Sequence, residues 1–262
     1  MSTEFRVGFY VGKDNTPNKI SKNEKLSSRG EQQKNLDLLL ESDQETLNEY
    51  YRFIDKCPCC GKKMVNVRFN KERWVLEHIC DNPGCQVEVL PLFIVDSEIY
   101  RYLPSIVVST IDKMSLIGIS NEFKALFGQV KRYCPIHGFS TGSKCTCAEA
   151  GCSGRAQAVG YLKDPVPTLF IQDEMHLIKE SLGTFDAHYE SFLYYYAKQM
   201  VQPDHRKKIR FIGATATISM YQDHIRNLYH MEPKRFPCEY PAVKTGEDFY
   251  SYTDEDDITR II

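Results

Sequence analysis

The chain has 262 residues, of which 42% are hydrophobic and 26% are charged, and its formal net charge is −2. This length allows one large domain or two small ones with a sizeable core. The near-neutral charge balance does not point to nucleic acid, although it still allows a local basic face. The first residues, MSTEFRVGFY, contain no basic segment followed by a long apolar stretch, and no run approaches 18 apolar residues. We therefore expect a cytoplasmic protein with no membrane partner.

Apolar and polar runs predict strands that alternate with helices. Strands are expected at 5–12, 104–114, 167–174 and 207–218. A polar loop is expected at 13–30, a long helix rich in helix formers at 31–54, and a further helix after each of the last three strands. Strands alternating with helices favour a parallel α/β sheet.

Cysteines interrupt this pattern in the middle of the chain. Nine of the ten lie between Cys57 and Cys152, and only Cys238 stands apart. In a reducing compartment, spaced cysteines indicate metal binding more often than disulfides. The sequence therefore predicts two metal-binding insertions between elements of the sheet.

The first cysteine set has the spacing of a structural zinc site. Cys57 and Cys60 form one close pair, and Cys80 and Cys85 form a second after a spacer of 19 residues. Two such pairs supply four thiolates that complete a tetrahedron around Zn²⁺ with no open position. Part of the spacer, VNVRFNKERWVLEHI, alternates like a β-hairpin, which predicts a zinc ribbon with Cys59 as a spare cysteine. Unligated core cysteines are the alternative.

The second set lies in the stretch YCPIHGFSTGSKCTCAEAGC. Its expected ligands are Cys134, His137, Cys147 and Cys152, a Cys₃His set, with Cys145 able to replace Cys147. Alternatively, half-sites pair across the two segments. Closed, thiolate-rich shells leave no position for a reactive water, so both zinc sites are expected to be structural.

Two adjacent carboxylates, Asp173 and Glu174, end the apolar run PTLFIQ just before a helix. Ligands of open α/β sheets bind outside the carboxyl ends of the strands. One carboxylate there can hold Mg²⁺, and the other can activate a water for phosphoryl transfer. Acidic residues also stabilise helix N-termini, and that structural role is the alternative.

A second apolar strand with a small hydroxyl motif follows about 40 residues later. FIGATATI places Thr215 and Thr217 after a strand, where they could hydrogen-bond His176 of DEMH and relay the nucleotide state. The order of apolar strand, D-E-x-H, spacer, apolar strand and T-A-T resembles the first RecA-like motor domain of superfamily 2 helicases. SIVVSTIDKM is similar to that family's nucleic-acid-contacting segment, and RVGFYVG to its upstream companion.

A closer resemblance links the chain to the helicase-like proteins of DISARM anti-phage defence systems. It is carried by DEMHLIKESLGTFDAHYE, GATATI and RFPCEYP, and it covers residues 5–12 and 104–245. The resemblance implies an α/β fold: a RecA-like parallel sheet with helices on both faces, interrupted by cysteine-rich zinc-binding insertions. It also implies ATP and Mg²⁺ as cofactors of the complete protein, DNA rather than RNA as the nucleic acid, and subunits of a defence complex as partners.

The resemblance also assigns roles by position. Asp173 would hold Mg²⁺, Glu174 would activate water, and His176 would couple nucleotide to nucleic acid together with the two threonines of the T-A-T motif. Thr110 and Asp112 would lie near a nucleic-acid backbone. The implied division is 1–54, the start of a partial RecA-like domain; 55–92, a zinc-ribbon-like insertion; 93–132, RecA-like core; 133–160, a second cysteine-rich insertion; 161–232, RecA-like core with both motifs; and 233–262, an extended linker.

The 262 residues lack the phosphate-binding P-loop G-x-x-x-x-G-K-[ST] that such motors require. VGKDN offers Lys13, but Asp14 follows where a hydroxyl should bind Mg²⁺. We therefore expect an internal piece of a longer ATP-dependent helicase or translocase that does not hydrolyse ATP alone. One alternative is a non-enzymatic, zinc-stabilised adaptor that binds nucleic acid or protein on a degenerate RecA-like scaffold. Another is a split motor whose P-loop comes from a partner chain.

Overall fold

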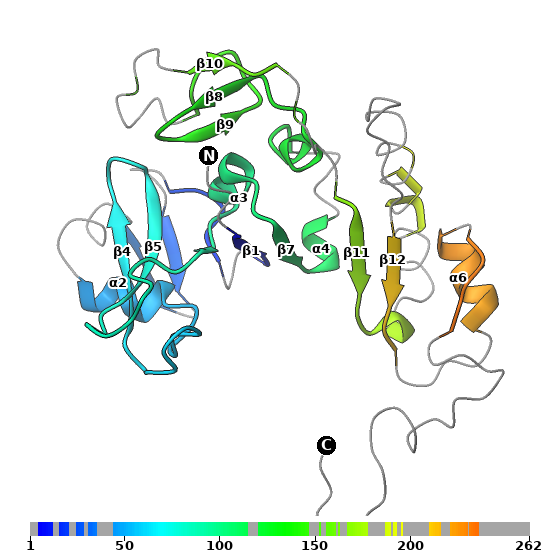
Figure 1. Cartoon of the computed structure of the whole chain (residues 1–262), viewed down its shortest axis with the longest axis horizontal. Helices are drawn as coiled ribbons and strands as arrows, with labels where there is room; N and C mark the ends of the chain where they lie inside the picture. Colours follow the sequence, from blue (N-terminus) through cyan, green and yellow to red (C-terminus); the bar gives the residue numbers. More distant parts are fainter. Residues whose placement is uncertain are drawn as a thin grey trace, which may run out of the picture. The chain divides into compact units, whose positions relative to one another are not determined.

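A computed structural model describes most of the first 146 residues and shorter segments after them. The described residues are 5–12, 16–20, 25–28, 31–35, 44–114, 120–146, 152, 156–160, 162, 167–177, 187–189, 191–192, 195, 210–215, 221–229 and 231–235. The chain divides into two compact units, which we call unit 1 (residues 1–168 and 197–209) and unit 2 (169–196 and 210–262). Both units contain parallel strands together with helical segments, so the fold is mixed α/β (Figure 1).

A three-stranded parallel sheet lies in unit 1, in the order β6-β1-β7. Its strands are β1 (Val7–Tyr10), β6 (Leu92–Phe93) and β7 (Ile106–Ser109). Helix α3 (Asp96–Tyr102) connects β6 to β7 and packs closely on β1, where a Cβ on Gly8 would lie 3.0 Å from the side chain of Ile99. Helix α4 (Ile111–Met114) follows β7, and the 3₁₀ helix η2 (Phe123–Phe127) comes later in the chain.

The cysteine-rich segments of unit 1 form antiparallel structure. Strands β4 (Val65–Asn70) and β5 (Val75–Cys80) make a hairpin, and the order β10-β8-β9 describes a small sheet of β8 (Arg132–Cys134), β9 (Gly138–Ser140) and β10 (Gln157–Ala158). The main buried cluster contains residues of both segments. Its members include Val67, Trp74 and Leu76 of the hairpin with Cys134 and Cys145 of the second segment. The two cysteine-rich segments therefore share one hydrophobic core.

Unit 2 contains a parallel pair of strands, β11 (Leu169–Gln172) and β12 (Arg210–Gly213). The 3₁₀ helix η4 (Met175–Leu177) follows β11, and helix α6 (Tyr221–Tyr229) comes after β12. One face of the pair carries the stacked rings of Phe170 and Phe211, and Tyr229 of α6 packs on Phe211 with ring centroids 5.1 Å apart. On the same strands, Leu169, Ile171 and Ile212 are exposed.

The expected strands at 5–12, 104–114, 167–174 and 207–218 are confirmed as β1, β7, β11 and β12, and the hairpin between the first cysteine pairs is confirmed as β4 and β5. A RecA-like arrangement of the sheets stays a prediction. In the part of the chain that the structure describes, no helix is long and apolar enough to cross a membrane.

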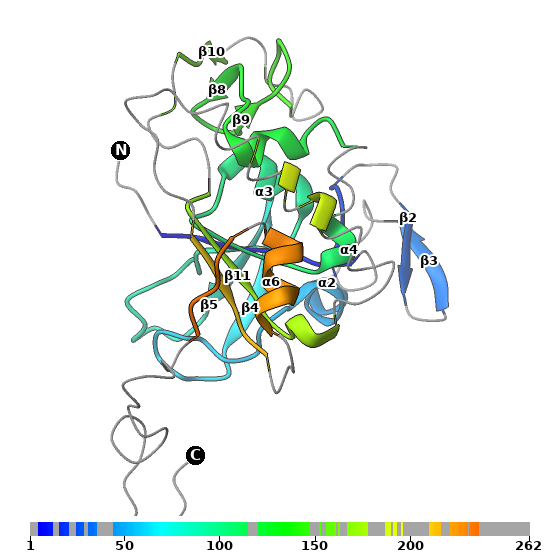
Figure 2. The ribbon, with the colours of Figure 1, turned by 90° about the vertical axis from the view of Figure 1, so that its right-hand side faces the viewer.

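The expectation of one helix over 31–54 is wrong. Helix α2 covers only Gln44–Tyr51, and Glu31–Asn35 forms strand β3, paired antiparallel with β2 (Lys25–Ser28) inside the segment expected to be a loop (Figure 2). The residues of β3, EQQKN, favour a helix by intrinsic propensity but offer no apolar face to bury. Propensity is a weak preference that pairing with another strand overrides.

Candidate metal centres and the DExH turn

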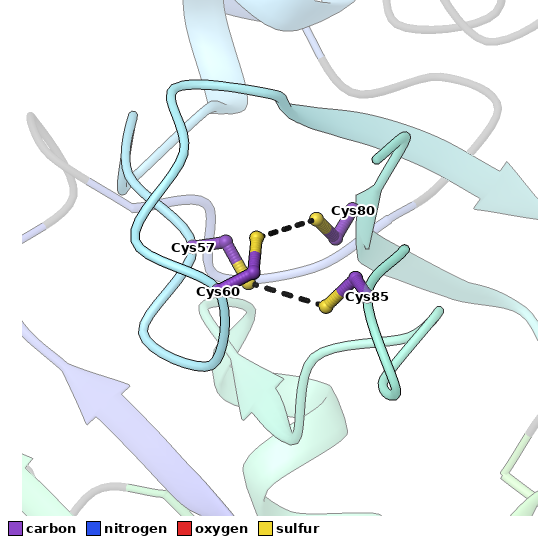
Figure 3. A group of neighbouring side chains, drawn as sticks. All are labelled: Cys57, Cys60, Cys80 and Cys85. Carbon is purple, nitrogen blue, oxygen red and sulfur yellow. Dashed lines mark hydrogen bonds between the residues drawn. The ribbon is translucent and has the colours of Figure 1, made fainter. Parts of the chain in front are cut away.

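The first cysteine set converges on a single point. The sulfurs of Cys57, Cys60, Cys80 and Cys85 all lie within 4.8 Å of one another, with Cys57 Sγ 3.8 Å from Cys85 Sγ and Cys60 Sγ 3.7 Å from Cys80 Sγ (Figure 3). In a tetrahedral zinc site with Zn–S bonds of about 2.3 Å, neighbouring sulfurs are about 3.8 Å apart. Both of these separations match that value, so the four thiols form a candidate Zn²⁺ site. We call this set the Cys₄ centre.

Two tight turns position these sulfurs. The Gly61 N–H donates to the carbonyl oxygen of Cys57 at 2.9 Å, and Gly61 has a φ of 72°, a left-handed conformation that glycine adopts without strain. The Cys85 N–H donates to the carbonyl of Asn82 at 2.9 Å on the other side. Cys80 ends strand β5, so the hairpin register fixes the position of the second pair.

The thiols of the Cys₄ centre affect one another's ionisation. A hydrogen bond from the Lys62 backbone, together with contacts to other side chains, lowers the pKa of Cys60 to about 6. At Cys85 the Val87 backbone acts in the same direction, but desolvation and the neighbouring thiols raise the pKa to about 12. Closely spaced thiols cannot all become thiolates unless a cation neutralises them, which is the chemical role that a bound Zn²⁺ would supply.

The second set also converges. The ligand atoms of Cys134, His137, Cys145 and Cys152 lie within 4.8 Å of one another. The Nδ1 atom of His137 is 3.6 Å from Cys134 Sγ and 3.4 Å from Cys145 Sγ, and the sulfurs of Cys134 and Cys152 are 3.6 Å apart. These separations match the edges of about 3.5–3.8 Å expected from tetrahedral zinc with its usual Zn–S and Zn–N bonds. We call this set the Cys₃His centre.

The structure places one of the two alternative cysteines of the second set. Cys145, the alternative to Cys147, is the cysteine that joins the Cys₃His centre, while Cys147 lies outside the described residues. Each centre is built within its own segment, so half-sites do not pair across segments among the residues that the structure describes. Cys59 is exposed and belongs to neither set, as expected for a spare cysteine.

The ring orientation of His137 supports metal binding independently. Its Nε2 lies 2.9 Å from the carbonyl oxygen of Glu72, which can only accept a hydrogen bond. Nε2 must therefore carry the ring proton, and Nδ1 directs a free lone pair at the thiols of Cys134 and Cys145. Histidines that bind metals commonly donate their other ring N–H to a carbonyl or carboxylate in this way. Sequence reasoning missed this contact, because the two residues are 65 positions apart.

In unit 2, the DExH residues follow β11 at the end of the parallel pair. Asp173 and Glu174 are exposed, and Glu174 has a φ of 53°, a conformation uncommon for a residue with a side chain. His176 Nδ1 lies 3.2 Å from Glu174 Oε2 and 3.3 Å from Thr215 Oγ1. The contact between His176 and Thr215 joins the turns that follow the two neighbouring strands, which is the juxtaposition that the motif order predicted.

Backbone hydrogen bonds tie these two turns together. The Met175 N–H donates to the carbonyl of Ala214 at 3.1 Å, and the Ala214 N–H donates to the carbonyl of Gln172 at 2.8 Å. Met175 is buried, and a Cβ on Gly213 would lie 1.8 Å from its sulfur. The lack of a side chain at Gly213 therefore leaves room for the buried side chain of Met175.

The remaining predicted residues are only partly described. Thr110 follows β7 in unit 1, where its N–H lies 3.4 Å from the carbonyl oxygen of Tyr10, and its own carbonyl accepts from the Met114 N–H at 3.3 Å. Asp112 lies in α4, but its side chain is outside the described part. Thr217 also lies outside the described residues. The nucleic-acid roles of Thr110 and Asp112 stay predictions.

Comparison with known proteins gives one informative relative, while no family model matches the chain. The chain is similar to the DISARM protein DrmA of Bacillus paralicheniformis, with 30% identity over 273 aligned positions. The alignment covers 95% of this chain and 22% of that protein. The chain thus resembles a DISARM protein along nearly all of its own length, and it spans about a fifth of its relative.

Proposed function

We propose that this chain is an internal part of an ATP-dependent nucleic-acid translocase or helicase that acts in anti-phage defence and carries two structural zinc centres. The contact between His176 and Thr215 at 3.3 Å carries the motor assignment, because it joins a D-E-x-H turn to the end of the neighbouring parallel strand. Similarity to the DISARM protein DrmA supports the role in defence. DNA is the proposed nucleic acid.

In this proposal the exposed carboxylates act on Mg²⁺–ATP. Asp173 would hold the ion through an oxygen ligand, and Glu174 would orient the attacking water. His176 bridges Glu174 and the hydroxyl of Thr215, so it could report the state of the nucleotide to the second strand. The phosphate-binding loop would come from another part of the longer protein.

The test compares ATP hydrolysis by the longer protein that a gene carrying this segment encodes. We expect DNA-stimulated turnover that falls by at least about a hundredfold in Glu174→Gln, because loss of the group that orients the reacting water typically costs that much. Asp223→Asn, an exposed acid on α6, is the matched control and should retain turnover. Equal activity in Glu174→Gln and the parent protein would contradict the motor assignment.

The adaptor reading is the second candidate, since both candidate metal centres have closed, thiolate-rich ligand sets. Both hypotheses make the same prediction for the 262-residue chain by itself, so the longer protein distinguishes them. We expect the chain by itself to contain two zinc ions and to lack appreciable ATPase activity. A longer protein that binds DNA but hydrolyses no ATP under any condition would favour the adaptor.

A further inference from the structure

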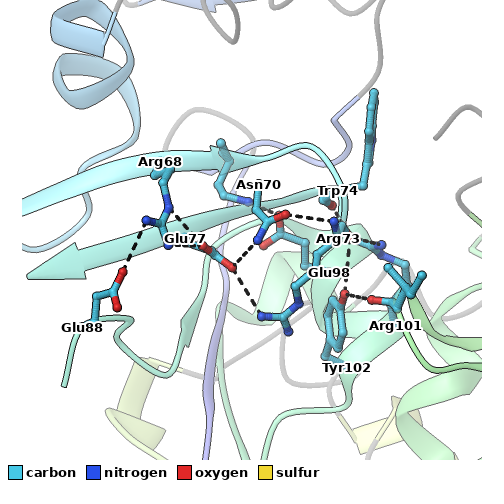
Figure 4. Close-up of polar contacts among 11 residues, drawn as sticks. Arg68, Asn70, Arg73, Trp74, Glu77, Glu88, Glu98, Arg101 and Tyr102 are labelled. Carbon is cyan, nitrogen blue, oxygen red and sulfur yellow. Dashed lines mark hydrogen bonds and ion pairs between the residues drawn. The ribbon is translucent and has the colours of Figure 1, made fainter.

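The turn of the β4–β5 hairpin (residues 65–80), which we call the zinc hairpin, is held by groups from two other segments of the chain. Residues 71–74 connect β4 to β5, and three consecutive carbonyls of this turn accept hydrogen bonds from outside the hairpin. The Glu72 carbonyl accepts from His137 Nε2 at 2.9 Å, and the Trp74 carbonyl accepts from Arg101 Nη2 at 2.6 Å. The Arg73 carbonyl between them lies 3.3 Å from Arg101 Nη1 (Figure 4). One of these donors belongs to the Cys₃His centre.

The turn has a backbone conformation that needs such support. Trp74 has a φ of 57°, which for a residue with a side chain costs on the order of 1–2 kcal/mol. Its indole is buried, and Nε1 donates to the carbonyl of Ile20 at 3.0 Å. A hairpin closed by a strained turn keeps this geometry only if its surroundings hold it in place.

The Cys₃His centre is itself fixed against α3, the helix that carries Arg101. The hydroxyl of Tyr102 donates to the carbonyl of Ile136 at 2.9 Å, next to His137. Gly138 has a φ of 78°, and a Cβ there would lie only 2.3 Å from the carbonyl oxygen of Arg101. Helix α3 therefore packs directly against the segment that carries His137, and both donate hydrogen bonds to the hairpin turn.

We propose that metal binding at the Cys₃His centre locks the turn of the zinc hairpin through His137, so that the two centres form one cooperative unit. This inference rests on the proposal above that both cysteine sets bind zinc. Metal at Nδ1 fixes the plane of the imidazole and leaves Nε2 as the only site for the ring proton, which then points at Glu72. Without metal, the ring can rotate or change tautomer, and in either case the turn loses its donor.

Two variants of the 262-residue chain separate the metal from the hydrogen bond. His137→Cys keeps four ligands for the metal but removes the Nε2–H donor, whereas Cys152→Ser removes a metal ligand and leaves His137 in place. Amide hydrogen exchange of residues 71–75 is the readout. We expect both variants to raise this exchange by roughly three- to tenfold, the effect of losing one hydrogen bond. Cys59→Ser, which alters an exposed cysteine outside both sets, is the matched control and should leave it unchanged.

Zinc content by mass spectrometry distinguishes failure of the coupling from failure of the metal assignment. Two zinc ions in the parent chain, with exchange at 71–75 unchanged in both variants, would overturn the coupling alone. A parent chain without zinc would overturn the metal centres and the coupling together. In the ¹¹³Cd-substituted parent chain, scalar coupling of the metal to His137 Nδ1 is the expected result, and coupling to Nε2 would overturn the proposal without any substitution.

Discussion

Glu98 shows how burial changes the chemistry of a single carboxyl group. Its side chain has no exposed surface, and Oε1 accepts the Leu76 N–H of the hairpin at 2.8 Å. Burial, partly offset by the nearby Arg101, raises the pKa of Glu98 to about 8 from an ordinary value of 4.5. The folded protein therefore keeps a proton on this residue at neutral pH, and a neutral acid connects α3 to the centre of the zinc hairpin.

A pH-dependent stability follows from this shift. Between about pH 4.5 and about pH 8 the unfolded chain has released the Glu98 proton while the folded chain retains it, so the free energy of unfolding falls as pH rises through this window. Each pKa unit is worth about 1.4 kcal/mol, so we expect a loss of at least about 2 kcal/mol. Glu98→Gln, which stays neutral, should remove this part of the slope. Urea unfolding at several pH values measures it, and identical slopes in both proteins would contradict the assignment.

At the residue scale, the sequence predicted which residue types would form the two candidate metal sites but could not name every member. Cys145 and Cys147 have similar spacing from Cys134 and identical chemistry, so local pattern could not choose between them. The fold places Cys145 in the main buried cluster, beside His137. Whether Cys145 reaches His137 depends on where β9 and the loop after it direct the chain, and that is a property of tertiary packing.

At the scale of elements, the cysteine-bearing end of the zinc hairpin has a small buried cluster of its own, separate from the main core. Val65 and Leu90 pack with the Cys₄ ligands Cys57 and Cys80 in a separate buried cluster. So few apolar side chains contribute little hydrophobic free energy, and small structures of this kind usually need a metal or a disulfide. None of the eight cysteines in the described part of the chain forms a disulfide.

Replacing one ligand should therefore destabilise the hairpin. In Cys57→Ser we expect the zinc content to fall from two ions to one, and a loss of at least about 2 kcal/mol would lower the melting temperature by roughly 4–8 °C. Cys59→Ser changes the same kind of residue in the same turn, but its sulfur is exposed and outside the set. It should retain both ions and the parent melting temperature. Equal zinc content in the two variants would argue against the Cys₄ centre.

Elements whose sequence carries a clear period could be predicted. Alternation identified β4 and β5, and apolar β-branched runs identified β7 and β11. Strand β6 has only two residues, too few for any period, and it forms because β1 offers a parallel edge at Val7 and Gly8. The predicted helix over 31–54 failed for a related reason, since pairing between β2 and β3 is decided by contacts that the helix propensity of EQQKN does not contain.

For the whole molecule, the candidate metal ligands and the candidate motor residues belong to different units. All eight described candidate zinc ligands belong to unit 1, whereas Asp173, Glu174, His176 and Thr215 belong to unit 2. The motif order predicted the contact between His176 and Thr215, because parallel neighbours end at the same edge of a sheet. It could not predict the contact of His137 with Glu72, since no local pattern links residues so distant in sequence.

Chelation should consequently affect one unit alone. After zinc removal we expect faster amide exchange in β4, β5, β8 and β9, because their ends carry or flank the ligands. Strands β11 and β12 contain no candidate ligand and should exchange at the parent rate. Hydrogen exchange with mass spectrometry, with and without a zinc chelator, gives both results in one experiment. Faster exchange in β11 and β12 would show that the metal centres also support unit 2.

Gly138 limits which substitutions this position can accept during evolution. Any side chain at that position would collide with the main chain of Arg101, and a collision with backbone is not relieved by a change of rotamer. In the dipeptide His137-Gly138, a candidate ligand is therefore followed by a residue without a side chain, which allows the ligand to lie against α3. Among related sequences, those that keep the histidine but replace the glycine should have released the second centre from the helix, and their two cysteine-rich segments should then vary in length and sequence independently of each other.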